Sequence, residues 1–254
     1  MIQKIITICN AKGGVGKTTS TASIGACMAL MGKKVLLIDL DGQANLTLYY
    51  IPNDSEIEVS IFDSLISGEP LPIINVKENL DIVPSSLEMA SAEIALTNLL
   101  AREQILSRLL DDVKQDYDYI LIDCPPSLEM LTLNGLAAAE GILVPVQCEY
   151  YALEGLSDLL TTLRMVKKRI NPQLEIFGVA LTMFDGRTNF STQVAQEVRR
   201  HFPGKVFASV IPRNIRLAEA PSHGLPVTAY DRSSRGAQAY RDLANEIYDK
   251  LKER

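Results

Sequence analysis

Several kinds of residue are scarce in this sequence. Its 254 residues include no tryptophan, two histidines and four cysteines, and no pair of cysteines has the CxxC spacing of a zinc or redox site. This scarcity favours reduced, buried thiols over a disulfide framework, with a metal site as the less favoured alternative. The residues concerned are Cys9, Cys27, Cys124, Cys148, His201 and His223.

Long apolar runs are also lacking. No run reaches the ~18 apolar residues of a membrane-spanning helix, and the opening MIQKIITICN leads into glycines and a lysine, unlike a signal peptide. We therefore expect a cytoplasmic protein. A hydrophobic content of 47% can supply a large core, so we expect one domain that spans residues 1–254.

Acidic residues are comparatively few in the last quarter of the chain. Residues 1–185 hold 13 Lys and Arg against 24 Asp and Glu, whereas residues 186–254 hold 12 against 7. The last quarter therefore carries +5 although the whole chain carries −6. This asymmetry indicates an anionic partner, and a solvated charged surface is the alternative.

Short β-branched runs alternate with longer helical patterns along the chain. The alternation predicts an α/β fold, a doubly wound, mainly parallel sheet with helices on both faces and with ligands at the carboxyl ends of its strands. Strands are predicted at residues 4–9, 34–39, 80–84, 118–125, 141–147, 175–183 and 205–212, and helices at 18–32, 87–113, 154–170 and 235–254. Residues 49–58 and 66–75 are expected to form surface loops.

A glycine-rich turn, ICNAKGGVGKTTS, joins the first predicted strand to the first predicted helix. Backbone amides in such a turn can surround a phosphate, and the helix N-terminus adds partial positive charge. In the G-x-x-x-x-G-K-[ST] pattern Lys17 reaches the β- and γ-phosphates and Thr18 binds Mg²⁺, although Ala11 occupies the first glycine position. A glycine-rich turn without a ligand is the alternative. The predicted nucleotide-binding residues here are Gly13, Gly14, Val15, Gly16, Lys17, Thr18 and Thr19.

Three aspartates lie where neighbouring strands are expected to end. Asp39 and Asp41 close the run VLLIDLD, and Asp123 closes YILID in the form of a Walker B element. We predict a magnesium site formed by Thr18, Asp39 and Asp123, and we predict that Asp41 orients the attacking water. Aspartates at such positions often serve only as helix caps, which is the alternative for each of them.

The residues described so far resemble a known family. KGGVGKTT is similar to the signature of the deviant Walker A ATPases, and DLDGQANLT, YILIDCPPSL, TMFDGRTN, IPRNIRLAEAPSHG and SRGAQAY resemble the ParA/Soj branch that partitions chromosomes and plasmids. The resemblance covers nearly the whole chain. It implies a P-loop ATPase that uses ATP and Mg²⁺ and forms an ATP-sandwich homodimer. It further implies non-specific binding to double-stranded DNA on the nucleoid, and release after a ParB-like partner stimulates hydrolysis.

The resemblance also explains why the loop contains a second lysine. Lys12 matches the signature lysine, which in this family crosses to the nucleotide of the other subunit. A positive side chain supplied in this way neutralises developing charge only when two subunits meet. We therefore predict catalytic roles for Lys12, Lys17 and Asp41, with a solvated loop lysine as the alternative for Lys12.

Further positions follow from the resemblance alone. It places Pro212 and Arg213 near the adenine, Gln43 and Asn45 in a first switch loop, and Pro125 in a second. The sequence departs from the family pattern at Ala11, Gly42 and Ala44, where Gln, Pro and Gly are common.

Two arginines of the basic last quarter resemble positions that ParA-like proteins use for DNA. Arg187 in DGRTN and Arg216 in RNIRL are expected in loops that follow strands, at the sheet edge that holds the nucleotide. A surface salt bridge is the alternative role for each. Only three residues precede the first predicted strand, so operator-specific repression by an N-terminal helix-turn-helix domain is not expected.

Other functions remain open at this point. A MinD-like or protein-cluster positioning ATPase would not use DNA, and a P-loop metabolic enzyme would need acid-base groups outside the nucleotide site. The last predicted helix is amphipathic, but it lacks Phe and Trp and a dense basic face, so we expect it to pack on the core and expect no membrane contact.

Overall fold

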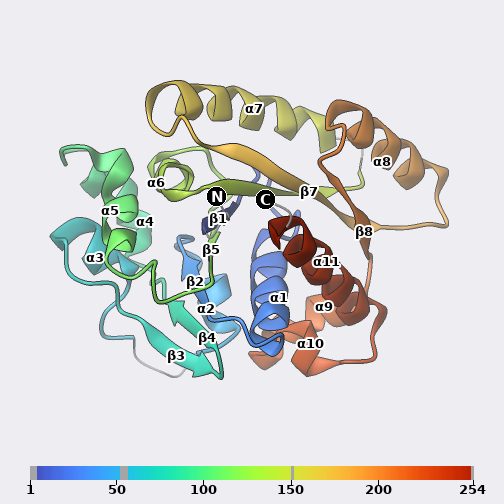
Figure 1. Ribbon diagram of the computed structural model, residues 1–254, viewed down its shortest axis with the longest axis horizontal. Coiled ribbons are helices and arrows are strands. Elements are labelled where there is room, and N and C mark those ends of the chain that lie inside the picture. Colours follow the sequence, from blue (N-terminus) through green and yellow to red (C-terminus); the bar gives the residue numbers. More distant parts are fainter. Residues whose placement is uncertain (1–4, 52–56, 150–151, 253–254) are drawn as a thin grey trace.

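In the computed structural model, eight strands form one sheet in the order β3-β4-β2-β5-β1-β6-β7-β8 (Figure 1). The structure describes residues 5–51, 57–149 and 152–252. All neighbouring strands run parallel except β3 and β4, which are antiparallel. The strands are β1 (Ile5–Ile8), β2 (Val35–Asp39), β3 (Ile74–Lys77), β4 (Leu80–Val83), β5 (Tyr119–Asp123), β6 (Gly141–Gln147), β7 (Glu175–Phe184) and β8 (Val206–Pro212).

Helices connect the strands and cover both faces of the sheet, which confirms the predicted doubly wound fold (Figure 1). They are α1 (Lys17–Leu30), α2 (Asn45–Leu48), α3 (Ile61–Ser67), α4 (Met89–Leu96), α5 (Ile105–Asp111), α6 (Met130–Ala138), α7 (Ala152–Arg169), α8 (Asn189–His201), α9 (Ile215–Glu219), α10 (Val227–Tyr230) and α11 (Arg235–Lys252). Two short 3₁₀ turns, η1 (Arg102–Gln104) and η2 (Ala220–His223), precede α5 and follow α9.

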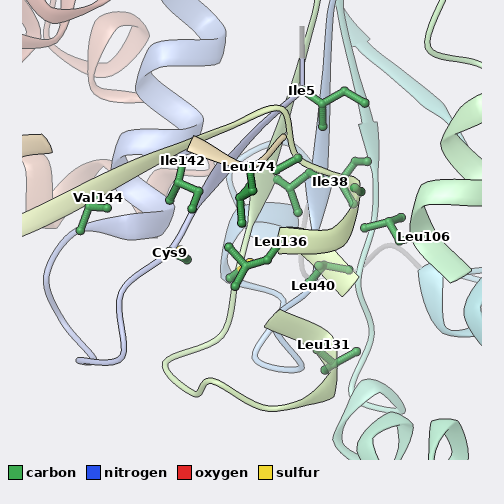
Figure 2. Close-up of a cluster of buried hydrophobic side chains, with 14 of the residues drawn as sticks. Ile5, Cys9, Ile38, Leu40, Leu106, Leu131, Leu136, Ile142, Val144 and Leu174 are labelled. Carbon is green, nitrogen blue, oxygen red and sulfur yellow. The ribbon is translucent and has the colours of Figure 1, made fainter. Parts of the chain in front are cut away.

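Two hydrophobic cores lie on opposite faces of the sheet. Along β1 the side chains alternate, because Ile5 and Cys9 enter one core and Ile6 and Ile8 enter the other. Helices α3 to α8 contribute to the first core, part of which Figure 2 shows, and helices α1 and α11 contribute to the second. Burial on both faces is the reason why the strands read as continuous apolar runs.

The four cysteines are all buried, as predicted. The last helix, α11, packs on α1 and β8, with five apolar or aromatic residues in the second core. These residues are Ala237, Tyr240, Leu243, Ile247 and Leu251. Of the helices in the described ranges, none combines the length and the low polarity that crossing a membrane requires.

The prediction of one helix over residues 87–113 was wrong. The structure has α4, the turn η1 and α5 there, and the chain reverses at Ala101, whose φ of 49° is left-handed. The side chain of Asn134 holds this break, because its amide donates to the carbonyl of Arg102 (2.8 Å) and accepts from the backbone N–H of Leu106 (3.1 Å). The hydrophobic pattern of the sequence is therefore helical throughout, although the helix itself is interrupted at a point that the side chain of Asn134 stabilises.

Two predicted loops also needed correction. The segment 66–75 ends in an edge strand, since β3 begins at Ile74 and α3 extends to Ser67. The segment 49–58 begins buried, because the hydroxyl of Tyr50 donates to the carbonyl of Ala22 on α1 (2.9 Å) and the ring of Tyr49 is also buried. Residues 52–56 of that segment lie outside the described residues.

Candidate nucleotide site

The glycine-rich loop leaves β1 at the centre of the sheet and enters α1. Gly14 (φ 71°) and Gly16 (φ 90°) are left-handed, a backbone conformation that glycine adopts without the steric cost of a Cβ. The loop is held from β7, because the hydroxyl of Thr182 donates to the carbonyl of Val15 (2.8 Å). This hydrogen bond ties the glycine-rich loop to β7.

Asn10 holds the first part of the same loop. Its buried amide donates to the carbonyl of Pro145 on β6 (2.7 Å) and accepts from the backbone N–H of Lys12 (3.1 Å). Our sequence analysis did not identify Asn10 or Thr182. In the sequence each is only a polar residue near the end of an apolar strand. Their hydrogen-bond partners lie 135 and 167 residues away, so no local pattern reveals these contacts.

Lys17 lies inside the loop, with 6% of its surface exposed. Its ammonium donates to the backbone carbonyls of Lys12 (3.0 Å) and Asn10 (3.3 Å). Burial lowers the pKa of Lys17, and the nearby carboxylate of Asp123 opposes that shift. Lys12 is half-buried, so the two lysines differ in burial although both belong to one loop.

Asp123 is fully buried at the end of β5. Its Oδ1 accepts a hydrogen bond from the hydroxyl of Thr21 on α1 (3.1 Å), and its Oδ2 has no hydrogen-bond partner among the residues that the structure describes. Burial and then the neighbouring Asp39 raise the pKa of Asp123, whereas Thr18, Lys17 and Thr21 lower it. A buried carboxylate oxygen without a partner is costly, so this position fits a cation or its bound water.

Asp39 lies beside Asp123, since the register of β2 and β5 pairs the two residues. The Oδ2 of Asp39 accepts from the backbone N–H and the hydroxyl of Thr47 (both 2.8 Å), and its Oδ1 accepts from the N–H of Asp41 (3.1 Å). Burial raises the pKa of Asp39 to about 6, against the lowering effect of these hydrogen bonds. Asp39 thus ties α2 and the loop before it to the sheet, and its role as a magnesium ligand stays a prediction.

Asp41 lies in the loop between β2 and α2 and is half-buried. Its Oδ1 accepts from the backbone N–H of Gln43 (3.0 Å), and its carbonyl accepts from the hydroxyl of Ser85 (2.8 Å). Ala44 in the same loop has a left-handed φ of 51°, which costs about 1–2 kcal/mol for a residue with a Cβ. This is one of the positions where we expected the family to prefer glycine, and the backbone there retains the glycine-like conformation. Asn45 begins α2 directly after it.

A pocket of about 220 Å³ opens beside the glycine-rich loop, at the ends of β7 and β8. It brings together four residues that we predicted to bind nucleotide, Gly16, Thr19, Pro212 and Arg213. Its other lining residues are Thr182, Met183, Ile211, Asn214, Leu217, Ala218 and Tyr240. Arg213 also pairs with Glu149 (2.8 Å). The pocket therefore adjoins the glycine-rich loop, and binding of a nucleoside there stays a prediction.

Both predicted DNA-binding arginines are exposed and form ion pairs. Arg187 pairs with both carboxylate oxygens of Asp185 (2.9 and 2.7 Å), and this contact lowers the pKa of Asp185 to about 2. Arg216 pairs with Glu219 (2.8 Å) and Asp231 (3.3 Å). Arg216 was expected in a loop but lies in α9, whose N-cap is Asn214. Contact with DNA remains a prediction for both arginines.

This arrangement is that of a P-loop nucleotide-binding protein, with a glycine-rich loop, a buried lysine and a Walker B aspartate at the carboxyl ends of adjacent parallel strands. A family model described as an AAA domain matches residues 3–176. The chain is 52% identical over 247 residues to the sporulation initiation inhibitor protein Soj of Bacillus subtilis, covering 96% of this chain and 98% of that protein. It is 44% identical over 254 residues to the chromosome-partitioning ATPase Soj of Treponema pallidum, covering 96% of both.

Solved structures show the same similarity. Cobyrinic acid a,c-diamide synthase from Mycobacterium smegmatis with bound ADP and magnesium superposes with a TM-score of 0.83 at 36% identity, covering 96% of this chain and 93% of that one. The septum site-determining protein MinD from Pyrococcus horikoshii, complexed with Mg-ADP, gives a TM-score of 0.78 at 30% identity, covering 96% and 95%. The chain belongs to the Soj/ParA family of ATPases, and the predicted family, fold and ATPase class are confirmed.

Proposed function

We propose that this protein is a DNA-partitioning ATPase. It binds ATP and Mg²⁺, dimerises around two nucleotides, binds double-stranded DNA without sequence preference, and leaves DNA when a ParB-like protein stimulates hydrolysis. The observation that carries the proposal is the buried pair of Lys17 and Asp123 at the loop, in a chain that matches partitioning relatives along nearly its whole length. We place the protein in the cytoplasm on the nucleoid, with no membrane partner.

The nucleotide would lie along the loop. The backbone of Gly13, Gly14, Val15 and Gly16 surrounds the phosphates, and Thr19, Pro212 and Arg213 border the pocket for the nucleoside. The ammonium of Lys17 exchanges its two carbonyl partners for phosphate oxygens, which are stronger acceptors for a charged donor.

The magnesium site would use Thr18 and Asp123, with Asp39 behind them. Thr18 would hold the ion through its hydroxyl, and Asp123 would hold it through its Oδ2, which has no hydrogen-bond partner among the described residues. When bound, Mg²⁺ neutralises the charge of the phosphate oxygens. Asp39 holds Asp41 and Thr47 in place through the hydrogen bonds described above, so it fixes the loop that carries the catalytic aspartate.

Hydrolysis would need two further residues. The carboxylate of Asp41 orients a water for in-line attack on the terminal phosphate, and its half-buried position leaves it accessible to that water. Lys12 of a second copy supplies positive charge at the transferred phosphate, so that assembly and hydrolysis are coupled. The nucleotide would therefore act both as substrate and as the contact that holds the dimer together.

DNA binding would depend on Arg187 and Arg216, each present twice in a dimer. Electrostatic affinity for DNA grows steeply with the number of phosphates contacted, so dimerisation converts weak binding into strong binding. Each arginine would first have to leave its acidic neighbour, and exposed ion pairs of this kind contribute little to stability because water screens them. Phosphate oxygens can therefore compete for both side chains.

The substitution Asp41→Ala tests the proposal. We expect the variant to bind ATP like the parent, to lose turnover, and to accumulate as an ATP-bound dimer in sizing chromatography. That dimer should shift a random DNA duplex in a gel, and Asp112→Ala on the exposed end of α5 is the control. A variant that stays monomeric with ATP contradicts the dimer, and ATP-dependent binding to liposomes but not to DNA favours the MinD-like alternative.

A further inference from the structure

A pocket of about 480 Å³ opens at the end of α1 that lies away from the glycine-rich loop. Helix α1 begins at Lys17 in that loop and ends at Leu30, ~20 Å further along its axis. There it contacts β4 and α10, which form two other walls of the pocket (Figure 1). The pocket is thus separate from the nucleotide site, and it has more than twice the volume of the pocket beside the loop, which is about 220 Å³.

The walls of this second pocket are mainly apolar. The small side chains of Ala26 and Ala29 on α1 leave space that larger residues would fill. The hydroxyl of Tyr50 already donates to the carbonyl of Ala22 (2.9 Å), so the polar end of this aromatic wall has its partner. The volume lies within the range of small-molecule sites. We call the space between Ala26, Ala29, Leu30, Tyr50, Leu80 and Pro226 the α1–α10 pocket.

Two cationic side chains line the α1–α10 pocket. Lys77 and Arg232 are exposed, and neither forms an ion pair with a residue that the structure describes. Among the described lining residues, Glu78 is the one acid against these two cations. The last carbonyls of α1 already accept from the backbone N–H groups of residues 31–33, which reduces the negative partial charge at that helix end. The pocket therefore combines an apolar interior with a net positive charge.

One wall of the α1–α10 pocket is linked to the nucleotide site. Tyr50 follows Tyr49, and the centroids of their rings lie 6.4 Å apart. The hydroxyl of Tyr49 donates to the hydroxyl of Thr19 (3.3 Å), which lines the pocket beside the glycine-rich loop. A ligand that packs on Tyr50 would restrain both tyrosines and hold Thr19 in place, so this ligand and a nucleotide should favour each other.

We propose that the α1–α10 pocket binds a small ring-containing molecule with one negatively charged group. The rings lie against α1, Tyr50 and Pro226, and the charged group lies between Lys77 and Arg232, whose side chains donate to its oxygens. A cationic ligand of the same shape would be repelled by the two cations. The coupling to the nucleotide rests on the function proposed above, whereas the binding does not.

Binding is tested with the fluorescent dye 1-anilinonaphthalene-8-sulfonate and with N-phenyl-1-naphthylamine, which has the same rings without the sulfonate. We expect the sulfonate dye to bind at one site, about tenfold more tightly than the uncharged dye. 1-Naphthoate should displace the sulfonate dye, whereas inorganic phosphate, which lacks rings, should not. Equal affinities of the two dyes overturn the proposal, because the charge of the pocket would then have no role.

Substitutions locate the bound dye. Arg232→Glu and Lys77→Glu should each weaken binding of the sulfonate dye about tenfold, and Ala229→Trp should abolish it by filling the exposed side of the pocket. Arg235→Glu, also exposed and three residues further along the chain, is the control and should not change binding. A misfolded variant would bind more of this dye and not less, so misfolding cannot mimic the expected loss. Equal losses in Arg232→Glu and Arg235→Glu, or displacement of the dye by Mg-ADP, overturn the proposal.

The link to the nucleotide site needs a separate titration. We expect saturating Mg-ADP to tighten binding of the sulfonate dye about threefold in the parent. Tyr49→Phe, which removes only the hydroxyl that contacts Thr19, should bind the dye like the parent but without that gain. Dye affinity that ignores Mg-ADP in the parent overturns the coupling and leaves the pocket. A parent that binds the dye but shows no binding of ADP in calorimetry contradicts the proposed function instead.

Discussion

The sheet runs from β3 at one edge to β8 at the other (Figure 1). The segments around the β3 edge are mostly acidic, whereas those around the β8 edge are mostly basic. Residues 57–140, which include α3, α4 and α5, hold 15 Asp and Glu against 4 Lys and Arg. Residues 186–254, which include α8, α9 and α11, hold 7 against 12. The glycine-rich loop leaves the sheet from β1, between these two ends.

The two ends also differ in how their charges are held. Asp39 and Asp123 are buried, and each accepts a hydrogen bond from a helix packed beside its strand, Asp123 from Thr21 on α1 and Asp39 from Thr47 on α2. Arg187 and Arg216 are exposed and pair with acids near in sequence. The buried carboxylates therefore offer a rigid site for a cation, while the exposed arginines offer charges that another anion can capture.

The largest effect is expected from removing the positive charge of Lys17, which lies in the loop between the acidic and the basic ends of the sheet. Lys17→Ala should lower ATP affinity by at least about 100-fold, because the loop pattern assigns this buried ammonium to the β- and γ-phosphates. Isothermal calorimetry measures this, with Lys34→Ala at the exposed start of β2 as the control. An unchanged ATP affinity would contradict the assignment of the glycine-rich loop as the phosphate-binding loop.

A smaller effect, on DNA binding alone, is expected from substitutions at the basic end of the sheet. Arg216→Ala should still dimerise on ATP but lower the slope of log affinity against log salt by about 2, because a dimer loses two phosphate contacts. Arg216→Lys should restore part of the binding, since a point charge suffices for a phosphate. Arg108→Ala on α5, at the acidic end, should not change the slope. DNA binding that is equal for all three variants in a salt titration would place the DNA surface elsewhere.

The smallest effect is expected from breaking the ion pair between Asp185 and Arg187, which frees the arginine for DNA. Asp185→Asn removes the paired carboxylate and should raise DNA affinity a few-fold in an anisotropy titration. The pKa of Asp185 is lowered to about 2, so the carboxylate stays ionised and the pairing persists at every higher pH. Lowering the pH from 8 to 5 should therefore not reproduce the effect of the substitution. Glu197→Gln, which releases Arg200 on α8, tests whether any freed arginine has the same effect.

Sequence patterns predicted the parts of this structure that depend on near neighbours. Seven of the eight strands, the phosphate loop and Asp123 follow from apolar runs and from the spacing of Gly16, Lys17 and Thr18. The strand β3 escaped prediction because it is a four-residue edge strand with three exposed side chains. Its sequence, INVK, has no continuous apolar run to distinguish it from a loop.

The parts that could not be predicted depend on contacts between distant residues. Nothing near Ala101 in sequence marks the end of a helix, and the amide of Asn134 that stabilises the break lies on α6. The same holds for Asn10, which contacts Pro145, and for Thr182, which contacts Val15. Side chains that hold a loop from another strand leave no periodic signal along the chain.

The buried hydrogen bond between Tyr240 and Ser20 (3.0 Å) joins the last helix to the first across 220 residues. Tyr240 also lines the pocket beside the glycine-rich loop. Because proteins are synthesised from the N-terminus, the loop leaves the ribosome long before the residue that completes its pocket. We therefore expect a nascent chain to gain full nucleotide affinity only after Tyr240 has been synthesised and has packed on α1.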